Sequence, residues 1–398
     1  MKRTAIPRYQ RFDGPILFRH GFRPFFLSAG IWAMLSMVLW LAMLMGWASL
    51  PTTFAPVDWH AHEMIFGFAG AAVAGFLLTA VPNWTGRMPL QGAPLIALFC
   101  AWLVGRVAMA MSAVIGPLPS MVLDLSFLVL LGLALTREIV SGRNWRNLPV
   151  LLALAFLIAA NLLTHLEALG IADTGQAGQR AGIAVLVGLI SLIGGRIIPS
   201  FTRNWLIKRG EEVMPLPFSG VDRVAIALTA AGLLVWVLAP ETPITGGLLL
   251  VAGVAGFVRL GRWRGHRTFS EPMVWSLHLG FLWVPAGLTA LGAGILWPSV
   301  FPATAAVHAL GAGAVGTMVL AVMTRATLGH TGRPTEADRP TAAIYILVAA
   351  AAAARVVAAL GVGAYEPLLW LAAAAWIGAF GLFSIHYGAS LVGRSANR

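Results

Sequence analysis

The chain contains, at residues 59–68, the stretch Trp59-His60-Ala61-His62-Glu63-Met64-Ile65-Phe66-Gly67-Phe68. This His-x-His-Glu motif opens a long apolar run that ends at Val81-Pro82-Asn83-Trp84. Ionisable groups at the first turn of a membrane-length helix are costly to desolvate, so they usually bind or move something. They can also lie among lipid headgroups beside Trp59 and contact only water. The stretch therefore predicts a membrane helix that begins with either a functional site or an interfacial cluster.

The chain as a whole is also strongly apolar. Its residues are 59% apolar and only 11% charged, against roughly 25% charged residues in soluble domains. Runs of about 17 to 25 apolar residues cross a bilayer as helices, and the connections here are too short for a separate soluble domain. The sequence predicts an all-α polytopic membrane protein, with residues 1–398 forming a single integral membrane domain. The predicted helices are twelve and lie near 25–47, 60–81, 93–113, 119–140, 148–169, 180–199, 222–239, 244–260, 273–296, 303–325, 341–360 and 366–390.

The distribution of charge over the loops predicts the orientation. Basic residues are concentrated in alternate loops, and the opposite loops carry mainly Asp58, Asp173, Glu241 and Glu366. Because positive loops are retained in the cytoplasm, both termini are expected there. This topology accounts for the formal charge of +12 without a nucleic-acid partner. Three arginines lie inside apolar runs: Arg106, Arg196 and Arg355. They are interpreted as snorkelling or helix-capping residues, with pairing to a buried anion as the alternative.

The ends of the second, sixth and tenth predicted helices are loosely alike. They read Pro82-Asn83-Trp84-Thr85, Phe201-Thr202-Arg203-Asn204-Trp205 and Thr324-Arg325-Ala326-Thr327. A spacing of four helices fits three four-helix units, although Trp, Thr and Arg are expected at membrane-helix ends in any case.

Four histidines are expected at one depth in the outer leaflet. They begin the second helix or lie about one turn inside the fifth and tenth, and they are His60, His62, His165 and His308. Imidazole suits iron, copper and zinc, and membrane haem is commonly held by histidines of facing helices. These four are therefore the predicted metal ligands.

Positions i and i+2 of a helix point to nearly opposite faces, so His60 and His62 are not expected to ligate one centre. They serve two neighbouring centres, or one is a ligand while Glu63 holds the other by a hydrogen bond. Glu63 is also the candidate catalytic residue, as a carrier of protons, with orientation of a histidine as its alternative role. The small residues 311–316 after His308 allow either close helix packing or a flat macrocycle beside this histidine.

A second group is expected on the inner side. It is a candidate haem or propionate site and comprises His20, Arg23, His278, Arg325 and His330. Cytoplasmic loops are routinely basic, so the two arginines are equally well explained by topology. His278 carries more weight because it is expected inside the hydrocarbon.

The motifs together resemble a known family. The stretches 19–26, 59–64, 81–87 and 322–333 are similar to those of the NnrS family, and they extend over most of the chain. The resemblance implies a twelve-helix protein of the bacterial cell inner membrane that contains haem b and copper. It also implies a link to nitric oxide and to protection against nitrosative stress, without a settled reaction or ligand set.

Two functions of different classes follow as hypotheses. The first is a haem and copper protein that handles nitric oxide, either as an oxidoreductase supplied with electrons by a quinol or by binding and sequestering the gas. The second is a twelve-helix transporter of an anion or metal ion with a histidine-lined path. A helix broken at mid-membrane would favour transport. The prolines cluster at helix ends, with Pro285 as the exception.

Overall fold

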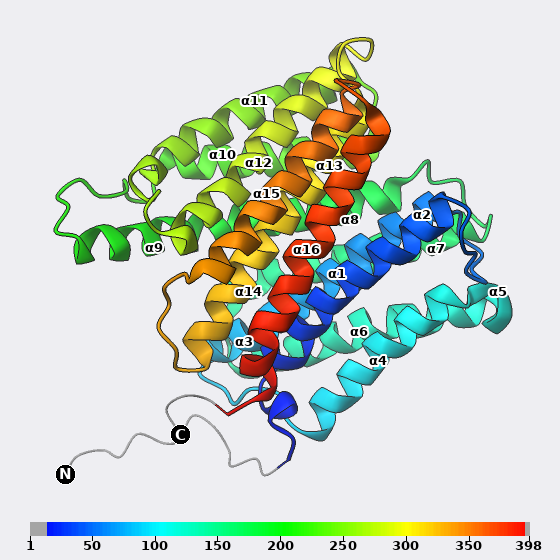
Figure 1. The fold of residues 1–398 in the computed structure, drawn as a ribbon, viewed down its shortest axis with the longest axis horizontal. Coiled ribbons are helices and arrows are strands. Elements are labelled where there is room, and N and C mark those ends of the chain that lie inside the picture. The colour runs from blue at the N-terminus through cyan, green and yellow to red at the C-terminus, as the bar shows by residue number, and fades with distance from the viewer. Residues whose placement is uncertain (1–13, 395–398) are drawn as a thin grey trace. The chain divides into compact units, whose positions relative to one another are not determined.

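The structure is a computed structural model, and it describes residues 14–394 (Figure 1). This part of the chain is helical and contains no strand. Twelve of its helices are long and apolar enough to cross a membrane, so the predicted all-α architecture with twelve spans is confirmed. The described chain divides into two compact units, residues 14–175 with 387–394 and residues 176–386. The single membrane domain and the cytoplasmic termini stay predictions.

The first unit contains five spans and the end of the last one. Its helices are α1 (Phe22–Leu44), α2 (Pro56–His62), η2 (Glu63–Ala69), α3 (Gly70–Thr85), α4 (Ala93–Ala110), α5 (Ser112–Ile115), α6 (Pro117–Ser141) and α7 (Leu148–Ala168), with short turns η1 (Ile16–Arg19) and η3 (Trp145–Asn147). The segments α2, η2 and α3 form one continuous span, Pro56–Thr85, and it is the most buried of the twelve.

The second unit contains the remaining spans. Its helices are α8 (Ala177–Leu189), η4 (Ile190–Gly194), α9 (Gly195–Lys208), α10 (Gly220–Leu238), α11 (Pro243–Gly261), η5 (Gly265–Arg267), α12 (Pro272–Leu296), α13 (Ala303–His308), η6 (Ala309–Gly316), α14 (Thr317–His330), α15 (Arg339–Ala359) and α16 (Tyr365–Val392), whose last residues belong to the first unit.

The helices begin and end where local sequence chemistry directs them. Pro56, Pro117 and Pro272 lie in the first turns of their helices, where a missing N–H costs nothing and the fixed φ suits a helix. At the end of α3, Gly86 takes a left-handed conformation with φ 71°, which a residue with a side chain rarely adopts. Several spans are longer than the apolar runs that predicted them, such as Pro56–Thr85 and Ala177–Lys208, because polar residues at their ends are helical as well.

Three spans contain a π-helical segment. These segments are η2, η4 and η6, and they lie in the second, sixth and tenth spans. Those are the spans whose ends resemble one another in sequence, so a structural feature now recurs with the same spacing of four helices. π-Helical turns are rare and are frequently found at functional sites. Side chains of neighbouring helices donate to two of these segments, Trp102 Nε1 to Gly67 O at 3.0 Å and Arg259 Nη1 to Ser191 O at 2.9 Å.

Candidate functional site

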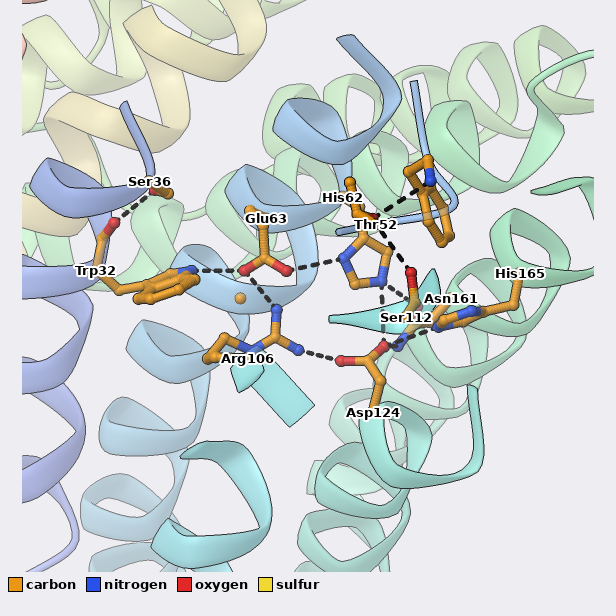
Figure 2. Close-up of polar contacts among 12 residues, drawn as sticks. Trp32, Ser36, Thr52, His62, Glu63, Arg106, Ser112, Asp124, Asn161 and His165 are labelled. Atoms are coloured by element: carbon orange, nitrogen blue, oxygen red, sulfur yellow. Dashed lines mark hydrogen bonds and ion pairs between the residues drawn. The ribbon is translucent and has the colours of Figure 1, made fainter. Parts of the chain in front are cut away.

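The first π segment begins inside a cluster of buried polar side chains. We call this the buried polar cluster, and it consists of His62, Glu63, Arg106, Asp124, Asn161 and His165 (Figure 2). Its members come from α2, η2, α4, α6 and α7, all in the first unit. Asn161 and His165 are four residues apart and therefore share one face of α7. Every member is at most 2% exposed.

Three donor atoms converge in this cluster. Asp124 Oδ2 lies 3.1 Å from His62 Nε2 and 3.0 Å from His165 Nε2. The three atoms lie within 4.8 Å of one another. Imidazole and carboxylate ligands bind a first-row metal ion at roughly 2.0 to 2.2 Å, which places neighbouring ligand atoms about 3 Å apart. The spacing of these atoms therefore suits a metal ion bound between them.

Asn161 completes the surroundings of these donors. Its Oδ1 lies 2.9 Å from His62 Nε2, and its Nδ2 donates to Asp124 Oδ2 at 2.8 Å. A carboxamide oxygen thus lies beside the same imidazole nitrogen as the carboxylate. It is an additional neutral oxygen donor for an ion in this position.

Arg106 balances much of the negative charge of the cluster. Its Nη1 donates to Glu63 Oε2 at 2.6 Å, and its Nη2 donates to Asp124 Oδ1. Buried carboxylates need such partners because desolvation of an unpaired charge is expensive. One guanidinium and two carboxylates leave one negative charge uncompensated. A cation, either a proton on an imidazole or a metal ion, can neutralise it.

Glu63 holds His62 in place. Its Oε1 lies 3.3 Å from His62 Nδ1, and its Oε2 accepts from Trp32 Nε1 at 2.5 Å as well as from Arg106. A metal-ligating histidine usually donates its other ring N–H to a carboxylate, which fixes the tautomer. Glu63 is placed to accept the Nδ1–H of His62 in this way, while Nε2 of His62 points at Asp124. The proton-carrying role of Glu63 stays a prediction.

Two glycines make room for the cluster. A Cβ on Gly67 would lie 2.4 Å from Glu63 Oε2 and 2.7 Å from Arg106 Nη1. A Cβ on Gly105 would lie 3.2 Å from the Cα of Asp124, so this glycine allows α4 and α6 to approach closely. Local sequence at these positions therefore sets the distance between the charged side chains.

Phe54 packs against both histidines. Its ring centroid lies 5.7 Å from those of His62 and His165. The loop that carries it is fastened to α5, because Thr53 N donates to Ser112 Oγ at 2.8 Å. An apolar ring on a tethered loop limits access of water to the donor atoms.

The four predicted outer ligands separate into distinct environments. His62 and His165 are brought together, whereas His60 stacks on Trp40 with ring centroids 4.2 Å apart. This separation of His60 from His62 follows from their i and i+2 positions. His308 belongs to the second unit, and its Nδ1 donates to Thr304 O at 2.7 Å.

The predicted inner residues have different neighbours from one another. Arg23 is buried and its Nη1 donates to the carbonyls of Ser390, Leu391 and Gly393, a favourable place for a cation because a helix ends there. His20 stacks against Phe22, with ring centroids 5.9 Å apart.

The remaining three inner residues lie in the second unit. His278 Nε2 donates to Thr202 Oγ1 at 2.8 Å, since that hydroxyl itself donates to Ile198 O. Arg325 lies 3.8 Å from the ring centroid of Phe201, and His330 is exposed at the end of α14.

Three members of the cluster were not predicted as site residues. Arg106 was interpreted as a snorkelling or capping residue in preference to a partner of a buried anion. That preference is wrong, because its side chain is buried between two carboxylates. Asp124 carried a usable signal, since an acidic residue inside an apolar run is by default a functional candidate. Asn161 carried no such signal.

The fold and the cluster define a class: a polytopic α-helical membrane protein with a buried His-Asp-His group able to hold a metal ion. The particular family follows from the sequence. The chain belongs to the NnrS family, whose sequence profile, described as NnrS protein, matches residues 16–394. A search among curated proteins found no match.

Proposed function

We propose that this protein is a metalloprotein of the bacterial inner membrane that binds nitric oxide and protects the cell against nitrosative stress. Family membership supports a nitric-oxide response in general terms. The observation that carries the proposal is the convergence of His62, Asp124 and His165 in a fully buried site. The three donor atoms are held in place by hydrogen bonds inside an apolar bundle, as the ligands of a preorganised metal site are. A structural ion pair would need only one cation and one carboxylate.

The gas itself fits such a site. Nitric oxide is small and uncharged, so it reaches a buried centre through lipid without a polar channel. A reduced iron or copper ion supplies the chemistry that binds it. The protein contributes the donor atoms, the Arg106 charge that holds Asp124, and the Phe54 ring that limits water.

His308 is suited to hold haem b. Its Nδ1–H is used by the carbonyl of Thr304, so the tautomer leaves Nε2 as the ligand atom, as in most haem and metal histidines. One turn further on, a Cβ at Gly311 would have no heavy atom within 4 Å. The helix therefore offers a ligand nitrogen and open space on adjacent positions, which suits a flat macrocycle.

Copper is the other metal that the family implies. Imidazole nitrogens suit it, and His62 and His165 provide two of them. The carboxylate of Asp124 is a harder donor, which suits a cuprous ion less well than sulfur does.

Turnover is an extension of binding. Two molecules of nitric oxide with two electrons and two protons give one nitrous oxide and one water, so an oxidoreductase would need a donor such as a quinol. Glu63, hydrogen-bonded to His62, is the residue through which we expect a proton to be delivered. Binding and sequestration require neither electrons nor protons.

The helices give little support to the transporter hypothesis. Eleven of the twelve spans within residues 14–394 are helical without a break, and the exception, Pro243–Arg267, is interrupted only near its end, where a turn separates α11 from η5. Pro285 lies inside the unbroken α12. The irregular segments are π-helical turns rather than unwound breaks at mid-membrane, which are the usual mark of a transport site.

The experiment is an anaerobic nitric oxide titration of the purified, reduced protein, followed by its absorption spectrum and its metal content. A Soret band that shifts on addition of the gas, together with a second metal that is lost in His62→Ala and His165→Ala, is expected. His266→Ala is the matched control, because this histidine lies in η5 of the second unit. Folded protein that contains neither haem nor metal would contradict the proposal and favour the transporter hypothesis.

A further inference from the structure

We infer that the ion held by His62, Asp124 and His165 is a non-haem ferrous iron rather than copper. The inference rests on the proposed function in that it takes this group to be a metal site. It goes further by assigning the ion, its ligand atoms and the residue that supports each ligand.

The type of donor points to iron. The group offers two imidazoles and one carboxylate from α2, α6 and α7, and two histidines with one carboxylate are the usual ligands of non-haem Fe(II) with open coordination positions. Copper binds nitric oxide in its cuprous state, and cuprous ions prefer thiolate or thioether sulfur to carboxylate oxygen. The nearest additional donor, Asn161 Oδ1, is again a hard oxygen.

Arg106 determines how the carboxylate can bind. Its Nη2 occupies Asp124 Oδ1, so only Oδ2 is directed toward the two imidazole nitrogens. Asp124 is therefore expected to bind the ion through one oxygen. That leaves coordination positions open for nitric oxide.

Charge alone does not choose between the two metals. With one guanidinium and two carboxylates, a cuprous ion gives a neutral cluster and a ferrous ion leaves one positive charge. The donor types therefore decide.

The test uses the whole protein, purified anaerobically from cells grown without added metal. Added metal is avoided because copper and zinc displace iron from most nitrogen and oxygen sites. Metal content is measured by mass spectrometry, and electron paramagnetic resonance is recorded after nitric oxide is added. Non-haem ferrous nitrosyl gives a spin-quartet signal, whereas haem nitrosyl gives a doublet, so the two irons are read separately.

We expect iron in excess of haem and a quartet signal in the wild type. Both should be lost in Asp124→Asn and in His165→Gln. His266→Gln is the matched control, because it makes the same kind of substitution at a histidine of η5 in the second unit, outside the buried polar cluster. This variant should keep the iron and the quartet signal. An intact Soret band in all variants shows that they are folded.

The failures can be told apart. Copper or zinc in place of the excess iron, lost in the same variants, overturns the assignment of iron and leaves the metal site and the proposed function intact. Iron that is lost equally in His266→Gln and Asp124→Asn overturns the ligand assignment. A wild type that carries the iron but binds no nitric oxide contradicts the proposed function, not this inference.

Discussion

Arg106→Met tests the electrostatic core of the first unit. The guanidinium donates to Glu63 and Asp124, and all three side chains are at most 2% exposed. The methionine side chain reaches only about as far as Nε of arginine and has no guanidinium, so it leaves both carboxylates buried without their cation. Removing one partner of a buried ion pair costs about 3 to 5 kcal/mol. We therefore expect the folding equilibrium constant to fall by roughly two to four orders of magnitude.

The assay is equilibrium unfolding in mixed micelles with increasing denaturing detergent, followed by tryptophan fluorescence. Arg87→Met is the matched control, because Arg87 pairs with Glu138 at 2.6 Å but is 36% exposed. Exposed pairs contribute about 0 to 1 kcal/mol. The triple change Arg106→Met, Glu63→Gln and Asp124→Asn should recover part of the loss, since it also removes the unpaired charges. The reasoning is refuted if Arg106→Met costs no more than Arg87→Met.

Three further predictions concern packing, haem and topology. Gly67→Ala should disrupt the buried polar cluster and lower its metal content, because a Cβ there would lie 2.4 Å from Glu63 Oε2. Gly70→Ala is its control, since the nearest atom to a Cβ there is 3.8 Å away, and equal metal content in both variants would contradict the argument. His308→Ala should lose most of the Soret absorbance per protein, while His266→Ala should retain it; unchanged absorbance in both would remove His308 as the haem ligand. At either terminus, a fused reporter that works only in the cytoplasm should be active and one that works only outside it should be inactive. A terminus found outside would contradict the predicted orientation.

Most of the fold could be predicted because hydropathy alone specifies it. A membrane span must satisfy its backbone internally, so a sufficiently long apolar run has helix as its only solution. The π segments could not be predicted in this way. Residues 309–316 are all apolar and mostly Gly and Ala, so α and π geometry give the same hydropathy pattern. The π segments also contact side chains of other helices, such as Trp102, which donates to Gly67 O. The sequence of the segment itself does not contain this information.

The candidate site could be predicted only in part. His62 and His165 were found from their expected depth, which helix positions along the chain provide. Depth says nothing of rotation, so the sequence could not tell that Arg106 points at Asp124 and Glu63 rather than along its own helix toward the interface. Asn161 was missed for the same reason, because it belongs to the site only through its contact with His62, which lies on another span. His60 and His62 were separable since their spacing fixes their relative direction.

The central claim is that the buried polar cluster is a metal centre, and a crystal structure of the protein with anomalous diffraction tests it most directly. Data collected at the iron, copper and zinc absorption edges locate any bound ion and identify it. The account predicts one anomalous peak at roughly 2.0 to 2.3 Å from His62 Nε2, Asp124 Oδ2 and His165 Nε2, strongest at the iron edge. The absence of a peak at this position at every edge, with the two imidazoles hydrogen-bonded directly to Asp124 in fully active protein, would contradict it.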